Sequence, residues 1–170
     1  EVRPEEIIIW GESLGGYPAC YLAANKDCRA LILFSTFNRI SDIVPSLTRY
    51  QNLQMLMTSA TYLSELNNDK LIGKIKFPTI IIHSYEDQLI SFWNAEKLYQ
   101  KLNSSTKHLI PIQGAHSKPI LTLDALDSLM NYLGLTVNYD RCQMQNLLNY
   151  LAEHDPLSYN KSREGFPKCI

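Results

Sequence analysis

The chain has 170 residues, with 16 Lys and Arg against 17 Asp and Glu and a formal net charge of −1 at pH 7. Its length suits one domain or part of one, and its content of 45% hydrophobic and 19% charged residues argues against wholesale disorder. The balanced charge removes the electrostatic case for nucleic-acid binding, and no apolar run approaches the roughly 20 residues of a transmembrane helix.

The chain begins at Glu1 rather than at Met, and an isoleucine-rich segment follows at Ile7. We therefore expect a processed product or a fragment. No targeting segment is recognised in the given sequence, so the cytoplasm is the default expectation.

Four runs of bulky and β-branched residues predict strands that are covered on both faces, because they do not alternate with polar residues. They are residues 7–10, 30–34, 79–83 and 108–112. Pro111 suits an edge or a strand end. Helical spacing predicts helices over 14–25, 92–102 and 123–133, with Ser91 as an N-cap and Gly134 as a stop. This alternation predicts an α/β fold with a parallel sheet flanked by helices.

Two regions fall outside the alternation. Residues 38–76 carry mixed helical signals and are long for a crossover, so we expect a small helical insertion after the second strand, which would cap the strand ends. Residues 135–170 form a C-terminal extension, with an amphipathic helix over 141–152 and then a loose tail. The main domain is predicted over 1–134.

Metal binding is not indicated by the four cysteines, Cys20, Cys28, Cys142 and Cys169, because their spacings are wide and no ligand pair accompanies them. Cys20 and Cys28 lie in apolar contexts and are expected in the core. Neither a metal nor another cofactor is expected.

Residues 11–16 read Gly-Glu-Ser-Leu-Gly-Gly, which contains the motif G-x-S-x-G directly after a predicted strand and before a predicted helix. This motif forms a tight turn that exposes a nucleophilic serine at the tip of a sheet. Side chains at Gly11 or Gly15 are expected to clash with neighbouring backbone. Ser13 is therefore the candidate nucleophile, and the backbone N–H of Leu14 is the candidate oxyanion donor.

A serine nucleophile needs a histidine base, and the histidine needs an orienting carboxylate. Asp87 follows the third predicted strand and His116 follows the fourth. Ser13, Asp87 and His116 thus occur in the chain order that this motif requires, each in a loop at the edge of the sheet where ligands of open α/β folds bind.

These features resemble the α/β-hydrolase superfamily, in particular the serine hydrolases that include prolyl-oligopeptidase-like proteins and protein depalmitoylases. The likeness is carried by residues 9–16, by residues 77–90 (FPTIIIHSYEDQLI), by Ala95-Glu96-Lys97-Leu98-Tyr99 and by Gly114-Ala115-His116. It covers about residues 6–133 and implies the C-terminal half of the fold. Ser84 stands where the family usually has Gly, and Ala115 stands where a Gly often precedes the base.

The resemblance also implies an N-terminal half that would supply further strands and the second oxyanion donor. Other acidic residues and histidines are alternatives to Asp87 and His116 or have a simpler structural interpretation. Glu86 and Asp42 are alternatives for the acid, whereas His83, His108 and His154 are interpreted as structural or surface residues and Asp124 and Asp127 as solvated ones. Tyr50, Met55, Met57 and Tyr62 are more simply core or cap packing than the lining of an acyl pocket.

The leading hypothesis is a serine hydrolase that cleaves an ester or thioester of a small-molecule or acylated substrate through a Ser-His-Asp triad and an acyl-enzyme. Transfer of the acyl group to an alcohol would use the same residues. One alternative is a truncated or non-catalytic relative that acts as a binding module. Another is a peptidase of the prolyl-oligopeptidase kind.

Overall fold

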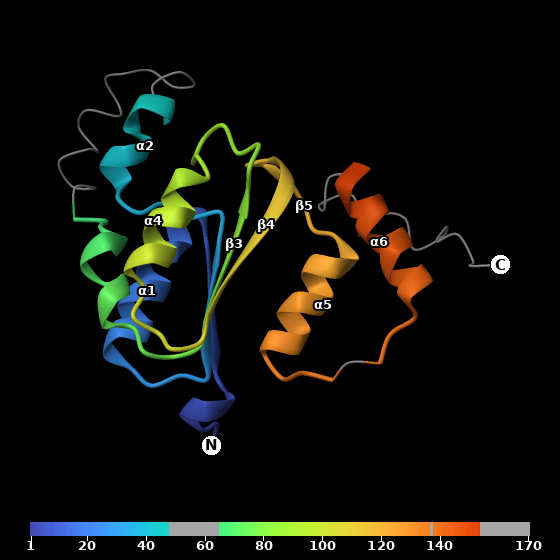
Figure 1. Ribbon diagram of the computed structural model, residues 1–170, viewed down its shortest axis with the longest axis horizontal. Helices are drawn as coiled ribbons and strands as arrows, with labels where there is room; N and C mark the ends of the chain where they lie inside the picture. The colour runs from blue at the N-terminus through green and yellow to red at the C-terminus, as the bar shows by residue number, and fades with distance from the viewer. Residues whose placement is uncertain (48–64, 137, 154–170) are drawn as a thin grey trace.

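The computed structural model describes residues 1–47, 65–136 and 138–153. Its centre is a five-stranded sheet whose strand order follows the chain order (Figure 1). The strands are β1 (Ile8–Glu12), β2 (Ala30–Phe34), β3 (Thr79–Ser84), β4 (Lys107–Ala115) and β5 (Lys118–Ile120). The first four are parallel, and β5 returns antiparallel to β4.

The predicted parallel strands are confirmed, and β2 and β3 are buried along their whole lengths. The prediction of four strands was incomplete, because β5 was missed. Its Lys118-Pro119-Ile120 segment is three residues long and includes a proline, so it shows no strand pattern. Pro111 of β4 is exposed and lies opposite His83 of β3. It comes before the part of β4 that pairs with β5, which is residues 113–115.

Helices cover both faces of the sheet (Figure 1). On one face, α1 (Gly16–Asn25) and α4 (Trp93–Lys101) bury small and apolar side chains such as Ala19, Cys20 and Leu98 against β2 and β3. On the other face, α5 (Leu123–Tyr132) packs Ala125 and Leu129 against the opposite sides of the same strands. The described chain also contains short 3₁₀ turns, which are η1 (Pro4–Glu6), η2 (Ser13–Gly15), η3 (Asn68–Lys70) and η4 (Ile72–Lys74).

The helix ends agree with the sequence at α5 and differ at α4. Thr122 caps α5 by accepting a hydrogen bond from the Ala125 N–H, and Gly134 stops the helix with a φ of +62°. The N-cap of α4 is Phe92 and not the predicted Ser91, and no side chain caps this end of the helix. The Ser91 carbonyl instead accepts the backbone N–H of Asn94.

The segment after β2, where the insertion is predicted, includes α2 (Ile40–Leu47). Ile40 and Ile43 of α2 pack with Phe37 and with Ile90 of the loop after β3. The predicted aromatic and methionine set at Tyr50, Met55, Met57 and Tyr62 lies outside the described residues.

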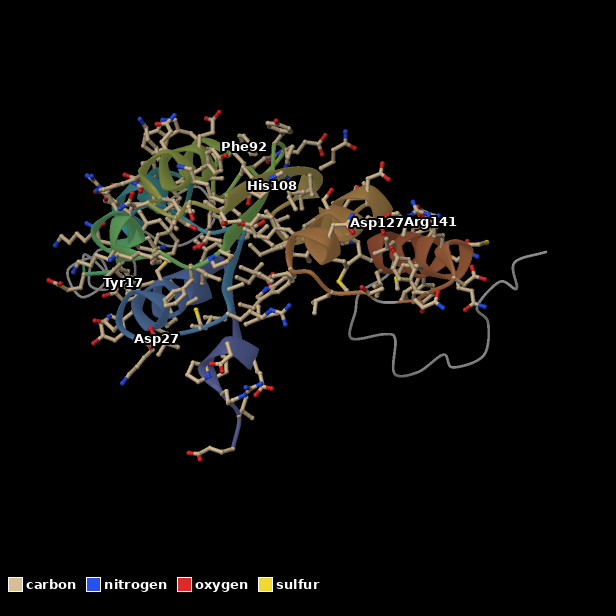
Figure 2. All side chains as sticks on the ribbon, turned by 60° about the horizontal axis from the view of Figure 1, so that its bottom comes forward. Tyr17, Asp27, Phe92, His108, Asp127 and Arg141 are labelled. Carbon is tan, nitrogen blue, oxygen red and sulfur yellow. The ribbon has the colours of Figure 1, made fainter. Side chains whose placement is uncertain are left out.

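After α5, helix α6 (Arg141–Glu153) lies against α5 and β5. The carboxylate of Asp127 on α5 accepts hydrogen bonds from Tyr139 and from the first residue of α6, Arg141 (Figure 2). None of the helices in the described ranges is long and apolar enough to cross a membrane. Residues 154–170, where the loose tail is predicted, lie outside the description.

Candidate active site

Ser13 lies at the point where β1 turns into helix. Its φ of 49° is left-handed, which is unusual for a residue with a side chain. The turn is tight because β1, η2 and α1 follow one another without a loop. A Cβ on Gly11 would lie 2.5 Å from the Cβ of Ala19 and 2.7 Å from the carbonyl oxygen of Gly15. Gly11 therefore lets α1 fold back onto the end of β1.

The second glycine that the turn needs is Gly16, not Gly15. A Cβ on Gly16 would lie 2.0 Å from the Thr36 hydroxyl oxygen, whereas one on Gly15 would have no atom within 4 Å. The expected clash at Gly15 is therefore wrong. Gly15 lies on the exposed side of the turn with ordinary helical dihedrals, and Gly16 faces the end of β2.

Ser13, His116 and Asp87 form one hydrogen-bonded chain. The Ser13 Oγ lies 3.0 Å from His116 Nε2, and His116 Nδ1 lies 2.7 Å from Asp87 Oδ2. The carboxylate can only accept, so Nδ1 carries the proton and Nε2 accepts the Ser13 hydroxyl proton. The three residues follow the carboxyl ends of β1, β3 and β4, which meet at one edge of the sheet.

The Asp87 carboxylate is buried and well supplied with donors. Its Oδ1 accepts the backbone N–H groups of Leu89 (3.0 Å) and Ile90 (2.8 Å). Burial alone would raise the pKa of Asp87, but hydrogen bonds from His116 and the Ile90 N–H, together with the His83 ring whose Nε2 lies 3.5 Å from Oδ2, outweigh it and hold the pKa well below its usual range. Asp87 therefore remains a carboxylate beside His116 at neutral pH.

The two alternative acids have other partners. Glu86 extends its carboxylate to the backbone N–H of Gly114 at 2.9 Å. Asp42 accepts the side-chain amide of Asn38 at 3.2 Å. Each of these carboxylates thus supports a loop, and Asp87 is the one that meets His116.

Two other histidines lie in the described chain. His83 is fully buried, its Nε2 donates to the Ile90 carbonyl at 2.7 Å, and the Phe92 ring meets it edge-on. His108, which is labelled in Figure 2, lies near the start of β4, and its ring stacks on Tyr132. It is therefore at the end of β4 that lies away from Ser13. His154 lies outside the described residues.

Leu14 follows Ser13 in η2, and its side chain is exposed. Its N–H belongs to the first turn of helical structure, where backbone donors have no partner within the helix. Such a donor beside the Ser13 Oγ is suited to an oxyanion. In the described chain no group of three or more His, Cys, Asp and Glu could hold a metal ion.

Sequence reasoning missed two residues that support the chain of three. The Thr36 hydroxyl donates to the Ser13 carbonyl at 2.6 Å. The Ser84 hydroxyl donates to the Gly114 carbonyl and accepts the N–H of Glu86, so the residue that departs from the family pattern connects the Asp87 loop to the His116 loop. The available signal for both was a polar residue at the carboxyl end of a buried strand, since Ser84 is the last residue of β3 and Thr36 lies two residues after β2.

Comparisons with known proteins find relatives that are named as alpha/beta hydrolase domain-containing proteins. Human alpha/beta hydrolase domain-containing protein 17B is 31% identical over 134 residues, which cover 78% of this chain and 43% of that protein. The chain thus spans less than half the length of the curated relatives that it matches first. No family model matches the sequence.

Solved esterases share the fold at low identity. An esterase from Pyrococcus furiosus superposes with a TM-score of 0.60 at 16% identity, over 75% of this chain and 52% of its own. Acetyl xylan esterase 1 from Thermoanaerobacterium also gives 0.60, at 18% identity, over 78% of this chain and 46% of its own. With its parallel sheet, its serine turn and these relatives, the chain belongs to the α/β-hydrolase superfamily.

Proposed function

We propose that the protein is a serine hydrolase that cleaves an ester or thioester bond through a covalent acyl-enzyme. The observation that carries the proposal is the hydrogen-bonded chain from Ser13 through His116 to Asp87. Its distances are those of a nucleophile, a base and an orienting acid that are ready to react.

The proposed reaction has two halves. His116 Nε2 takes the hydroxyl proton as Ser13 Oγ attacks the substrate carbonyl, and Asp87 stabilises the imidazolium that forms. The Leu14 N–H donates to the oxygen on which negative charge develops. His116 then gives its proton to the leaving alcohol or thiol, which leaves an acyl group on Ser13.

Hydrolysis of the acyl-enzyme reverses these roles. His116 takes a proton from water, the resulting hydroxide adds to the acyl carbonyl, and Ser13 leaves with the proton that His116 returns. An alcohol in place of water would give acyl transfer with the same residues. The low pKa of Asp87 supports the cycle, since the acid stays charged throughout.

The length of the chain bears on whether it acts alone. It matches only 43% of the human relative, and we propose that residues 1–134 form part of a hydrolase domain with 135–170 as an extension. The second oxyanion donor would come from a preceding part of the fold. Loss of one such donor costs about 3 kcal/mol of transition-state stabilisation, so the 170-residue chain is expected to react slowly if it reacts at all.

A binding module without activity is the second candidate, and the partial coverage of its relatives is the observation that favours it. Labelling with a serine-reactive fluorophosphonate, followed by peptide mass mapping, separates the two candidates. The 170-residue chain and any longer natural product are both labelled, with circular dichroism as the test of folding.

We expect an adduct on Ser13 that is absent from Ser13→Ala and retained in Ser105→Ala, which removes an exposed serine from the loop between α4 and β4. An adduct only on the longer product would identify this chain as an incomplete enzyme. Folded proteins of both lengths that never form the adduct would refute the hydrolase proposal and favour the binding role.

A further inference from the structure

Two neighbouring strands end in the same unusual way. Glu12 of β1 lies opposite Phe34 of β2, and the residue after each, Ser13 and Ser35, has a positive φ of 49° and 45°. In the described chain these are the non-glycine residues with left-handed backbone. Both strands therefore break at the same level of the sheet.

The break after β2 brings Thr36 against the serine turn. Thr36 is completely buried, and its hydroxyl donates to the carbonyl oxygen of Ser13 at 2.6 Å. The same side chain fills the space in front of Gly16, where a Cβ would lie 2.0 Å from the hydroxyl oxygen. Thr36 thus touches the serine turn on two sides.

The bonded atom matters because Ser13 holds a strained conformation. Left-handed backbone persists in a residue with a side chain only where its surroundings hold it there. The carbonyl of Ser13 accepts the Thr36 hydroxyl as well as the N–H of Gly16. The first bond comes from the segment that follows β2, so it ties the Ser13 peptide to the neighbouring strand end and not only to its own turn.

We propose that Thr36 is a positioning residue for the nucleophile: its hydroxyl holds the Ser13 peptide at the orientation that points Oγ to His116. This inference rests on the proposed hydrolase function. Thr36 touches no reacting atom in this scheme and acts through the backbone of Ser13. Displacement of a reacting group by about 1 Å can lower a rate a hundredfold.

Matched substitutions separate the hydroxyl from the packing. Thr36→Val keeps the shape and removes the donor, whereas Thr36→Ser keeps the donor and removes a methyl group. In the longest natural form of the protein, we expect Thr36→Val to lower the rate constant of fluorophosphonate labelling at Ser13 by roughly tenfold to a hundredfold. Thr36→Ser should stay within about threefold of wild type.

Steady-state kinetics on p-nitrophenyl acetate, as a small ester probe, adds a second readout. The Val variant should lose kcat with KM little changed, because the hydroxyl acts on the nucleophile and not on substrate contacts. Should the Val variant fail to fold, Thr36→Ser and Thr36→Ala form the test, since both lack the methyl group and differ only in the hydroxyl.

A measurement independent of activity distinguishes this inference from the proposed function. The ¹³C shift of the Ser13 carbonyl reports its hydrogen bond directly and should move in the Val or Ala variant and stay near the wild-type value in Thr36→Ser. The variants could show this pattern of carbonyl shifts while the wild-type protein never forms a fluorophosphonate adduct on Ser13. That result would refute the hydrolase proposal and leave the backbone hydrogen bond established. Equal labelling in the variants with and without the hydroxyl, or an unmoved carbonyl shift, would overturn the positioning role.

Discussion

Two adjacent glycines of the serine turn are expected to respond in opposite directions to the same substitution. Gly15→Ala adds a methyl group to open space, at dihedrals (φ −64°, ψ −13°) that alanine prefers. Gly16→Ala adds it 2.0 Å from the Thr36 hydroxyl oxygen and 2.6 Å from the Thr36 Cβ. The comparison therefore isolates steric contact from the general effect of replacing glycine.

The magnitudes follow from these surroundings. Alanine at Gly15 reduces the freedom of the unfolded chain and should stabilise the fold by about 0.4–1 kcal/mol. Alanine at Gly16 overpacks a site where Thr36 is fully buried, at a cost of about 1–3 kcal/mol. Displacing Thr36 also breaks its hydrogen bond to Ser13, which adds about 1 kcal/mol.

Urea unfolding followed by the fluorescence of Trp10 and Trp93 would measure both variants. With a slope of about 2 kcal/mol per molar urea, Gly16→Ala should lower the midpoint by about 1–2 M, and Gly15→Ala should raise it by a few tenths of a molar. Equal losses in the two variants would refute the assignment of the close contact to Gly16.

Two further outcomes are expected. Asp87 has a pKa well below its usual range in the folded protein, so it stabilises the fold above the ordinary carboxyl pKa of about 4, and this contribution is lost as the pH falls toward the folded value. Urea unfolding at a series of pH values should therefore show a steeper acid loss of stability for wild type than for Asp87→Asn, and parallel curves would contradict this linkage. Burial raises the pKa of Cys20 to about 12, so iodoacetamide at pH 8 should leave this thiol unmodified in the native protein and alkylate it in urea, whereas equal rates in both would show that α1 opens readily.

The positions of Ser13, Asp87 and His116 could be predicted from sequence because each follows a run that is apolar enough to identify a buried parallel strand. Parallel strands bring their carboxyl ends to one edge, so chain order alone implied proximity. The choice between Glu86 and Asp87 could not be made in this way, because adjacent residues share that argument. The backbone of the loop decides it, since the N–H groups of Leu89 and Ile90 turn toward Asp87.

Other features could not be predicted because they depend on contacts between distant segments. The motif G-x-S-x-G does not say which segment contacts which glycine, and the neighbour of the turn proved to be Thr36, which lies two residues after the end of β2. Strand β5 exists because it pairs with the end of β4, and not because of its own composition.

The strand order has a consequence for biosynthesis. Because β1 to β5 are neighbours in the order in which they are made, each new strand can add to a sheet edge that already exists as the ribosome releases the chain. No later strand has to insert between two earlier ones within this sheet. Ser13 and Thr36 emerge before His116, which emerges only with the end of β4, so the serine turn can form before His116 reaches it. Under the proposed function, the nucleophile therefore stays without its base until nearly all of this sheet is in place.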